Sequence, residues 1–156
     1  HDEAGQVSAD AVNHIAMTKK RRNKLKTLAD ELPAPEVHGA DSGEVLLVGW
    51  GSTKGPLLEA VDKFGNNGDA LSALHIKHIK PLPNGLEAIF SRFKSVYVVE
   101  MNDGGVYGYG QLAGVLRARF ADARIKGINK TAARRWKVSE IIERVEARRA
   151  EETATA

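Results

Sequence analysis

The sequence predicts an α/β domain whose mostly parallel sheet is covered by helices on both faces, in three layers. Three observations support this. Apolar runs that suit strands alternate along the chain with stretches of helical periodicity. Several of these runs are continuously apolar, as in parallel strands that are buried on both sides. The 156 residues are enough for one domain with a substantial core.

The first strand–turn–helix unit has the sequence EVLLVGWGSTKGP. Val45–Val48 predicts a buried strand, Gly49–Gly51 a sharp turn, and Gly55–Phe64 a helix. Ser52 and Thr53 are expected to act as helix N-caps. In open α/β sheets, ligands and partners usually meet the carboxyl ends of the strands. This turn is therefore the first candidate contact region.

The remaining elements of the domain follow in alternation. The stretch Gly65–Gly68, GNNG, predicts the end of the first helix. We then expect a strand within Ala70–Ile79, a helix over Leu86–Phe93, a strand over Ser95–Glu100, a glycine-rich loop over Met101–Tyr109, a helix over Gly110–Phe120, a strand near the sheet edge over Arg124–Ile128, and a helix from Trp136 to about Arg148. The order of the strands in the sheet does not follow from the pattern.

The domain has an extension at each end. Residues 1–41 are expected to form a linker that carries a charged helix from about Val12 to Glu31. Its apolar stripe is thin, so we expect that helix to lean on another surface. The prolines that follow Leu32 end it. Residues 42–148 form the α/β domain, and residues 149–156 are expected to be a flexible tail.

The charge of the chain is modest but unevenly distributed. The net charge is +3, with basic clusters at Lys19–Lys26 and Arg124–Lys137. Such clusters can bind nucleic acid. Because a small net charge gives little long-range attraction, a solvated helix face or a contact with an acidic subunit is favoured, and we expect no nucleic acid partner.

The composition also limits the class of protein. The chain has no cysteine, which excludes a disulfide framework, thiolate ligands for an iron–sulfur cluster and a catalytic thiol within it. No apolar run approaches the roughly 20 residues that cross a membrane. Nothing resembles a signal peptide, so we expect a cytoplasmic location and no membrane contact. The sequence opens HDE without an initiator methionine, and we expect a piece of a longer polypeptide.

The glycine turn GWGSTKG invites comparison with nucleotide-binding loops. The dinucleotide fingerprint G-x-G-x-x-G is one residue shorter, and it needs an acidic residue after the second strand, where His75–His78 is basic. The position of Lys54 does not fit a Walker loop. A helix N-terminus can still hold an anion. A free-standing dinucleotide- or anion-binding domain therefore remains the alternative function.

Metal and catalytic sites are not indicated. On a strand, His75 and His78 point to opposite faces. No Ser/His/Asp set or pair of carboxylates suggests catalysis, so we expect no catalytic, cofactor-binding or metal-binding residue. Polar residues do gather at two predicted strand ends and the helices that follow. The candidates for an interface or an anion contact are Trp50, Gly51, Ser52, Thr53, Lys54, Glu100, Asn102 and Gln111.

Several motifs in this order resemble one enzyme family. They are HDEAG followed by Asp10, Met17 and Lys20-Arg21, then VGWGSTKGP, HIKHIKPLP, VVEMN and GQLAGVLR. From His1 to about Val145, the chain resembles the C-terminal part of the alpha subunit of 2-oxoacid:ferredoxin oxidoreductases, and the 2-oxoglutarate type (2-oxoglutarate synthase) in particular. Asp103–Tyr109 looks like an insertion in that pattern.

The resemblance implies a fold and a role. The corresponding domain of the family is core domain II, which is related to the transketolase C-terminal domain. The intact enzyme decarboxylates a 2-oxoacid on thiamine diphosphate, passes electrons through an iron–sulfur cluster to ferredoxin and forms an acyl-CoA. Thiamine diphosphate, magnesium and the cluster are expected outside this chain. We therefore expect a structural, subunit-interface domain that is inactive alone, with the preceding alpha-subunit domain and the beta subunit as partners, and ferredoxin and CoA as partners of the whole enzyme.

Overall fold

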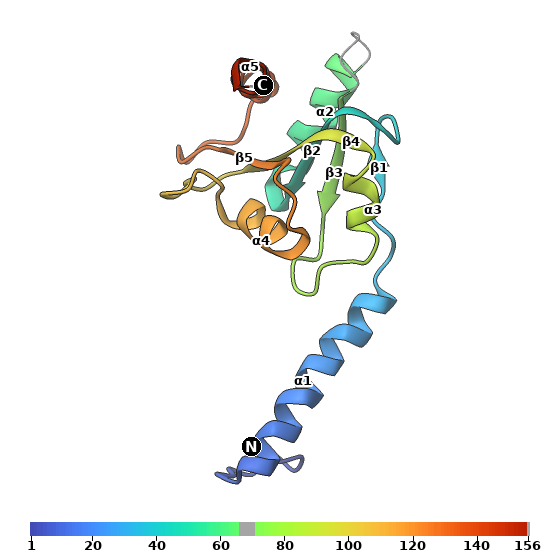
Figure 1. Cartoon of the computed structure of the whole chain (residues 1–156), viewed down its shortest axis with the longest axis vertical. Helices are drawn as coiled ribbons and strands as arrows, with labels where there is room; N and C mark the ends of the chain where they lie inside the picture. Colours follow the sequence, from blue (N-terminus) through green and yellow to red (C-terminus); the bar gives the residue numbers. More distant parts are fainter. Residues whose placement is uncertain (66–70, 156) are drawn as a thin grey trace. The chain divides into compact units, whose positions relative to one another are not determined.

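In the computed structural model, which describes residues 1–65 and 71–155, five strands form one sheet (Figure 1). The elements are α1 (Ala11–Glu31), β1 (Val37–His38), β2 (Gly43–Trp50), the 3-10 helix η1 (Gly51–Thr53), α2 (Lys54–Phe64), β3 (Leu71–Ile76), α3 (Leu86–Phe90), β4 (Phe93–Glu100), α4 (Gln111–Phe120), β5 (Ile125–Asn129) and α5 (Val138–Thr155). Helices α2, α3 and α4 follow strands of the sheet in the chain. From β2 to the end of α5, helices and strands alternate along the chain, as the sequence pattern predicts.

The sheet has the strand order β1-β3-β2-β4-β5. The four longer strands are parallel to one another, and β1 is antiparallel to β3. Val48 of β2 lies opposite both Leu74 and Val98, so β2 is flanked on both sides by parallel strands. The prediction of a mostly parallel sheet is confirmed. The strand after Arg124 is at the sheet edge, also as predicted.

The core lies on both faces of the sheet. Helices α2 and α5 pack on one face, where they share a buried cluster with alternate strand residues such as Leu47, Tyr97 and Val99. Successive strand residues point to opposite faces, so Leu46 and Val98 belong to the other face. Helices α3 and α4, which come from the second half of the chain, both contact β4. The ring of Phe90 in α3 packs edge to face against the ring of Phe120 in α4. The three predicted layers are therefore present.

Three predicted boundaries are wrong. Val37–His38 is a strand of the sheet rather than part of a linker, because a two-residue strand is too short to show alternation. Phe93 begins β4 instead of ending a helix, and it is buried in the core. Helix α5 continues to Thr155, so the predicted tail is helical over the part that the structure describes. The predicted turn residues at 66–68 lie outside the described residues.

The chain divides into two compact units, one of which is His1–Ala34 with His78–Asn84, and the other the α/β domain. In the first unit, Asp10 caps α1 by accepting a hydrogen bond from the backbone N–H of Asn13 at 2.6 Å. None of the residues of α1 is buried. Among the residues that the structure describes, no helix is both long and apolar enough to cross a bilayer.

Candidate functional site at the carboxyl edge of the sheet

Three parallel strands end together at one edge of the sheet. Trp50 is the last residue of β2, Glu100 the last of β4 and Asn129 the last of β5. Glu100 is paired in register with Asn129. Because parallel strands run in the same direction, their final side chains are presented to the same set of loops. The carboxyl edge thereby brings together residues that lie up to 79 positions apart in the chain.

Glu100 is the centre of this edge and is completely buried. Its carboxylate accepts hydrogen bonds from the backbone N–H groups of Leu112 and Ala113, both at 2.9 Å. It also accepts from the side-chain amide of Asn102 at 2.8 Å and from the indole N–H of Trp50 at 3.4 Å. A carboxylate has about four acceptor positions, so little capacity remains for a ligand.

The two backbone contacts place Glu100 at the N-terminus of α4. The positive end of the helix dipole and its unsatisfied N–H groups stabilise a negative charge there. Although a helix N-terminus can bind an external anion, at α4 the protein supplies the anion itself. Glu100 therefore fastens β4 to α4 and has no need of an external cation as a counter-ion.

The network continues to the neighbouring strand. The side-chain amide of Asn129 donates to the Asn102 side-chain oxygen at 2.8 Å. The indole N–H of Trp136 donates to the backbone carbonyl of Glu100 at 3.3 Å. Glycine is required at position 110, next to Asn129, because the φ of this residue is +75° and a Cβ would collide with the Asn129 amide. These bonds connect the ends of β2, β4 and β5 through polar groups.

The turn after β2 is held differently from the prediction. A Cβ on Gly49 would collide with Leu57 and Thr53, so glycine lets α2 approach the strand closely. Gly51 has a φ of +56°, which glycine adopts readily. Thr53 is the N-cap residue of α2, as predicted, but its hydroxyl donates to the backbone carbonyl of Trp50 at 2.9 Å and caps no N–H group.

A small cavity opens between these loops. Its volume is about 190 Å³. Ligand sites in proteins usually enclose about 300–1,000 Å³, so the cavity is small for a dinucleotide. Six of the eight candidate residues line it, together with Met101. The lining residues are Trp50, Gly51, Ser52, Thr53, Met101, Asn102 and Gln111.

The two other candidates take different places. Glu100 lies beneath the surface, where Trp50 and Asn102 bind it. Lys54 is exposed as the first residue of α2. At the cavity itself, the Ser52 hydroxyl contacts the Met101 sulfur at 3.6 Å.

His75 and His78 differ in environment. The His75 side chain reaches the turn after β2, where its Nε2 lies 3.1 Å from the backbone carbonyl oxygen of Gly51. His78 falls beyond the end of β3 at Ile76. Over the part of the chain that the structure describes, no three histidine, aspartate or glutamate side chains come together in a way that could hold a metal ion.

Several known proteins with similar sequences have names that point to one enzyme family. The chain is 32% identical over 152 residues to 2-oxoacid:ferredoxin oxidoreductase 2, subunit alpha, from Aeropyrum pernix, a match that covers 93% of the chain and 23% of the relative. It is 36% identical over 108 residues to subunit alpha of oxidoreductase 1 from the same organism, covering 65% and 17%. This chain is related to the alpha subunits of 2-oxoacid:ferredoxin oxidoreductases. No protein-family model matches it.

A solved structure agrees with the enzyme family, and a second one agrees with the fold. The 2-oxoglutarate:ferredoxin oxidoreductase of Magnetococcus marinus, solved with 2-oxoglutarate, coenzyme A and succinyl-CoA bound, matches 94% of the chain and 25% of its own, with a TM-score of 0.81 and 28% identity. A split-gene transketolase matches 73% of the chain and 40% of its own with a TM-score of 0.55 and 15% identity, and this likeness shows the fold alone.

The match is to part of an alpha subunit. The chain spans about a fifth of the length of the curated relatives, including 19% of the 2-oxoglutarate oxidoreductase subunit KorA of Mycobacterium tuberculosis, to which it is 29% identical over 134 residues, or 81% of the chain. The predicted resemblance and fold are confirmed: the chain is a partial domain of these alpha subunits with a transketolase-like fold.

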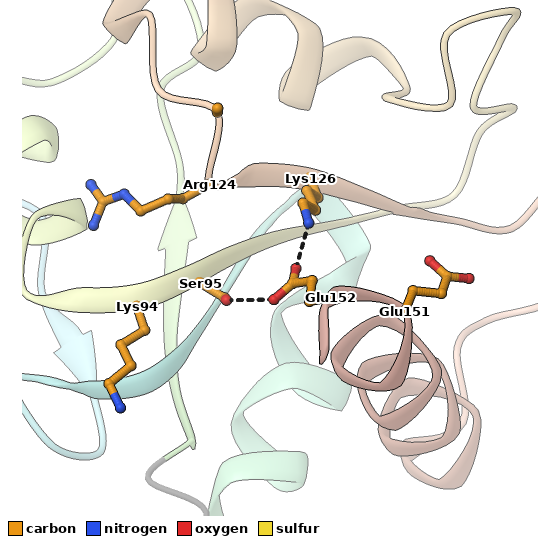
Figure 2. Close-up of a pocket in the computed structure, with 7 residues that line it drawn as sticks. Lys94, Ser95, Arg124, Lys126, Glu151 and Glu152 are labelled. Atoms are coloured by element: carbon orange, nitrogen blue, oxygen red, sulfur yellow. Dashed lines mark hydrogen bonds and ion pairs between the residues drawn. The ribbon is translucent and has the colours of Figure 1, made fainter. Parts of the chain in front are cut away.

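A second and larger hollow of this alpha-subunit domain lies at the opposite, amino edge of the sheet. Its volume is about 500 Å³, and Figure 2 shows its charged lining. Glu152 of α5 accepts hydrogen bonds from Lys126 at 2.7 Å and from Ser95 at 3.0 Å. Arg124 pairs with Asp122 at 2.7 Å. Lys126 and Glu152 therefore pair within the hollow, whereas Arg124 pairs with a carboxylate outside its lining.

Sequence reasoning missed three residues of the carboxyl-edge network. Asn129 lies one position beyond the predicted end of the last strand, and the rule that parallel strands end together could have found it. The sequence pattern places Trp136 at the start of a helix and gives no sign that its indole donates to the Glu100 carbonyl. Met101 lies between two candidates and lines the cavity with them. A thioether carries no polar signal in a sequence.

Proposed function

We propose that this chain is the C-terminal structural and subunit-interface domain of the alpha subunit of a 2-oxoacid:ferredoxin oxidoreductase. The intact enzyme would oxidise and decarboxylate a 2-oxoacid, with 2-oxoglutarate as the favoured substrate, form the acyl-CoA and reduce ferredoxin. The observation that carries the proposal is the likeness to the Magnetococcus marinus enzyme, which extends over 94% of the chain. It is supported by curated alpha subunits from two other organisms.

The domain would contribute no reacting group. Glu100, the one fully buried carboxylate at the carboxyl edge among the described residues, already accepts four hydrogen bonds. The Thr53 hydroxyl is used within its own turn. A buried carboxylate whose acceptor positions are largely occupied is a poor general base, because a base must accept a proton from the substrate. The network supports a rigid platform more readily than a catalytic site.

The cofactors of the intact enzyme would be held elsewhere. Thiamine diphosphate with its metal ion, and an iron–sulfur cluster, are the groups we infer for it. The sequence has no cysteine to ligate a cluster. The described carboxylates and histidines do not gather into a metal-binding group. The residues present therefore do not fit these groups.

The exposed rim of the carboxyl edge would face neighbouring parts of the enzyme. Ser52, Lys54 and Gln111 are exposed on top of the buried network. A rigid base with exposed polar groups suits an interface whose rim is solvated. The partners would be the rest of the alpha subunit and the beta subunit, while ferredoxin and CoA would act with the whole enzyme in the cytoplasm.

The test compares the 156-residue chain with the intact enzyme. With 2-oxoglutarate, CoA, thiamine diphosphate and Mg²⁺, the intact complex should reduce ferredoxin or a viologen dye, and the chain alone should not. Other 2-oxoacids in the same assay identify the substrate class. Dye reduction by the chain alone would contradict the proposal. So would a thermal shift of the chain with NAD, NADP or phosphate, which the dinucleotide or anion alternative expects.

A further inference from the structure

The loop after β4 contains a turn that is closed by backbone hydrogen bonds. The backbone N–H of Gly108 donates to the carbonyl of Gly105 at 3.2 Å, which closes a β-turn with Val106 and Tyr107 at its centre. A second bond, from the N–H of Gly110 to the carbonyl of Gly104 at 3.1 Å, closes the loop again below the turn. The backbone of the loop is therefore held by its own hydrogen bonds.

The base of this loop is fastened to the domain. The Arg117 guanidinium lies 4.3 Å from the centre of the Tyr109 ring, in a cation–π contact. The backbone of Tyr109 passes so close to Gly127 of β5 that a Cβ there would collide with it. Gly110 fits against the Asn129 amide. The turn thus projects from the same carboxyl edge on a fixed support.

The tip of the turn is apolar and almost fully exposed. Val106 is 96% exposed and Tyr107 is 83% exposed. Central turn positions usually hold glycine, proline, asparagine, aspartate or serine. Single exposed apolar residues need no explanation, but two adjacent ones on an ordered turn form a preorganised contact, and tyrosine is frequent among interface hot spots. From Gly104 to Leu112 the sequence GGVYGYGQL carries no charge.

We propose that the tip Val106–Tyr107 anchors this domain in an uncharged, apolar pocket of the remainder of the same alpha-subunit polypeptide. This rests on the proposed function. A tyrosine buries roughly 150–250 Å², whereas a stable complex of separate proteins buries roughly 1,200 Å² or more. An anchor of this size holds well only where a covalent connection raises the effective concentration. The related alpha subunits continue far beyond this chain, which spans 25% of the Magnetococcus marinus chain.

The experiment places a photo-crosslinking residue at the tip in the intact enzyme. Tyr107→p-benzoylphenylalanine is irradiated in a mixture of ¹⁵N-labelled and unlabelled alpha subunits, and the linked peptides are identified by mass spectrometry. The expected product joins Tyr107 to a peptide of the same alpha polypeptide outside these 156 residues. Products with a second alpha copy or with the beta subunit, or no protein product, would each overturn the proposal.

A control probe and a second variant separate anchoring by the tip from nonspecific crosslinking and from a change in the stability of the domain itself. The same probe at Glu143, an exposed residue of α5, should give different products or none. The double variant Val106→Ser, Tyr107→Ser should lower the Tm of the intact enzyme and leave that of the 156-residue chain unchanged. An equal change in both would overturn the proposal. Dye reduction by the unmodified enzyme is measured in parallel, so that a failure of the proposed function is recognised separately.

Discussion

The two edges of the sheet solve the problem of charge in different ways. At the carboxyl edge, one completely buried carboxylate, Glu100, is surrounded by neutral donors and the N-terminus of α4. At the amino edge, charged groups pair with one another near the surface. Lys126 pairs with Glu152 (Figure 2), and Arg124 pairs with Asp122. The carboxylate of the first arrangement is completely buried, whereas the ion pairs of the second are partly exposed.

This difference determines how much each edge contributes to stability. Leaving a buried polar group without its partner costs about 1–3 kcal/mol, whereas exposed ion pairs contribute roughly 0.2–1 kcal/mol. A carboxyl edge that is fixed in this way can present Ser52, Gln111 and the Val106–Tyr107 turn in a constant geometry. A partner surface needs such a geometry, because ordering flexible groups upon binding reduces affinity.

Glu100→Gln should have the largest effect. The amide can keep the hydrogen bonds at one oxygen, but its NH₂ group then faces the N–H of Ala113, and the negative charge at the helix N-terminus is lost. The lost bond and the lost dipole interaction together amount to about 2–4 kcal/mol. Urea unfolding of the two chains measures the difference. The matched control is Glu143→Gln on exposed α5, which should stay within about 0.5 kcal/mol.

A loss below about 1 kcal/mol for Glu100→Gln, which is the range of the exposed pairs, would break the comparison. It would mean that water or a rearranged Asn102 replaces the lost bond, and that the carboxyl edge is more adaptable than its burial indicates. The near-ultraviolet circular dichroism of Trp50 and Trp136, whose indoles both bind Glu100, reports such a rearrangement.

Gly110→Ala should have the next largest effect. The φ of +75° and ψ of −169° belong to a region that is almost restricted to glycine, and occupying it costs another residue about 1–3 kcal/mol. The new Cβ would also displace the Asn129 amide. Gly114→Ala is the matched control, because a Cβ there meets open space in the middle of α4, and it should stabilise the chain by about 0.5–1 kcal/mol. Equal effects of the two substitutions in thermal denaturation would contradict this.

The sequence predicts which residues gather at the carboxyl edge better than it predicts the hydrogen bonds among them. The alternation of strands and helices predicts a parallel sheet, and parallel strands end on the same side of it. These two points suffice to place Trp50, Glu100 and Asn102 near one another. The hydrogen bonds cannot be predicted in this way, because the partner that a side chain reaches depends on the local backbone torsion angles. Thr53 shows this: its position suits an N-cap, but its hydroxyl turns back to the Trp50 carbonyl.

The sequence predicts short or ambiguous elements poorly for a different reason. Leu86, Ile89, Phe90 and Phe93 have helical spacing, but a buried strand also begins with an apolar residue, and Phe93 belongs to β4. Strand β1 has two residues and is defined by its partner β3 rather than by a local pattern. The last turns of α5 contact distant strands, where Glu152 accepts hydrogen bonds from Ser95 and Lys126. Tertiary contacts of this kind override local propensity.

The amino edge should respond to pH with a small effect. Hydrogen bonds from Arg124 hold the pKa of Asp122 below its ordinary value. A carboxylate whose pKa is lowered by folding stabilises the folded state above the unfolded pKa of about 3.9, and this contribution is lost as the pH falls through the folded pKa. Asp122→Asn removes this contribution. The free energy of unfolding of the wild type should therefore exceed that of the variant by under about 1 kcal/mol at pH 7, and the two should be equal in strong acid.

Unfolding in urea at several pH values between neutrality and strong acid measures this difference. Asp41→Asn is the control, since it removes a carboxylate that is 85% exposed beside the start of β2, and its difference from the wild type should be small throughout. High salt should reduce the Asp122 effect, because the partly exposed Arg124 is screened. A difference at pH 7 as large as that of Glu100→Gln would show that partly exposed ion pairs stabilise the amino edge as strongly as the buried carboxylate stabilises the carboxyl edge.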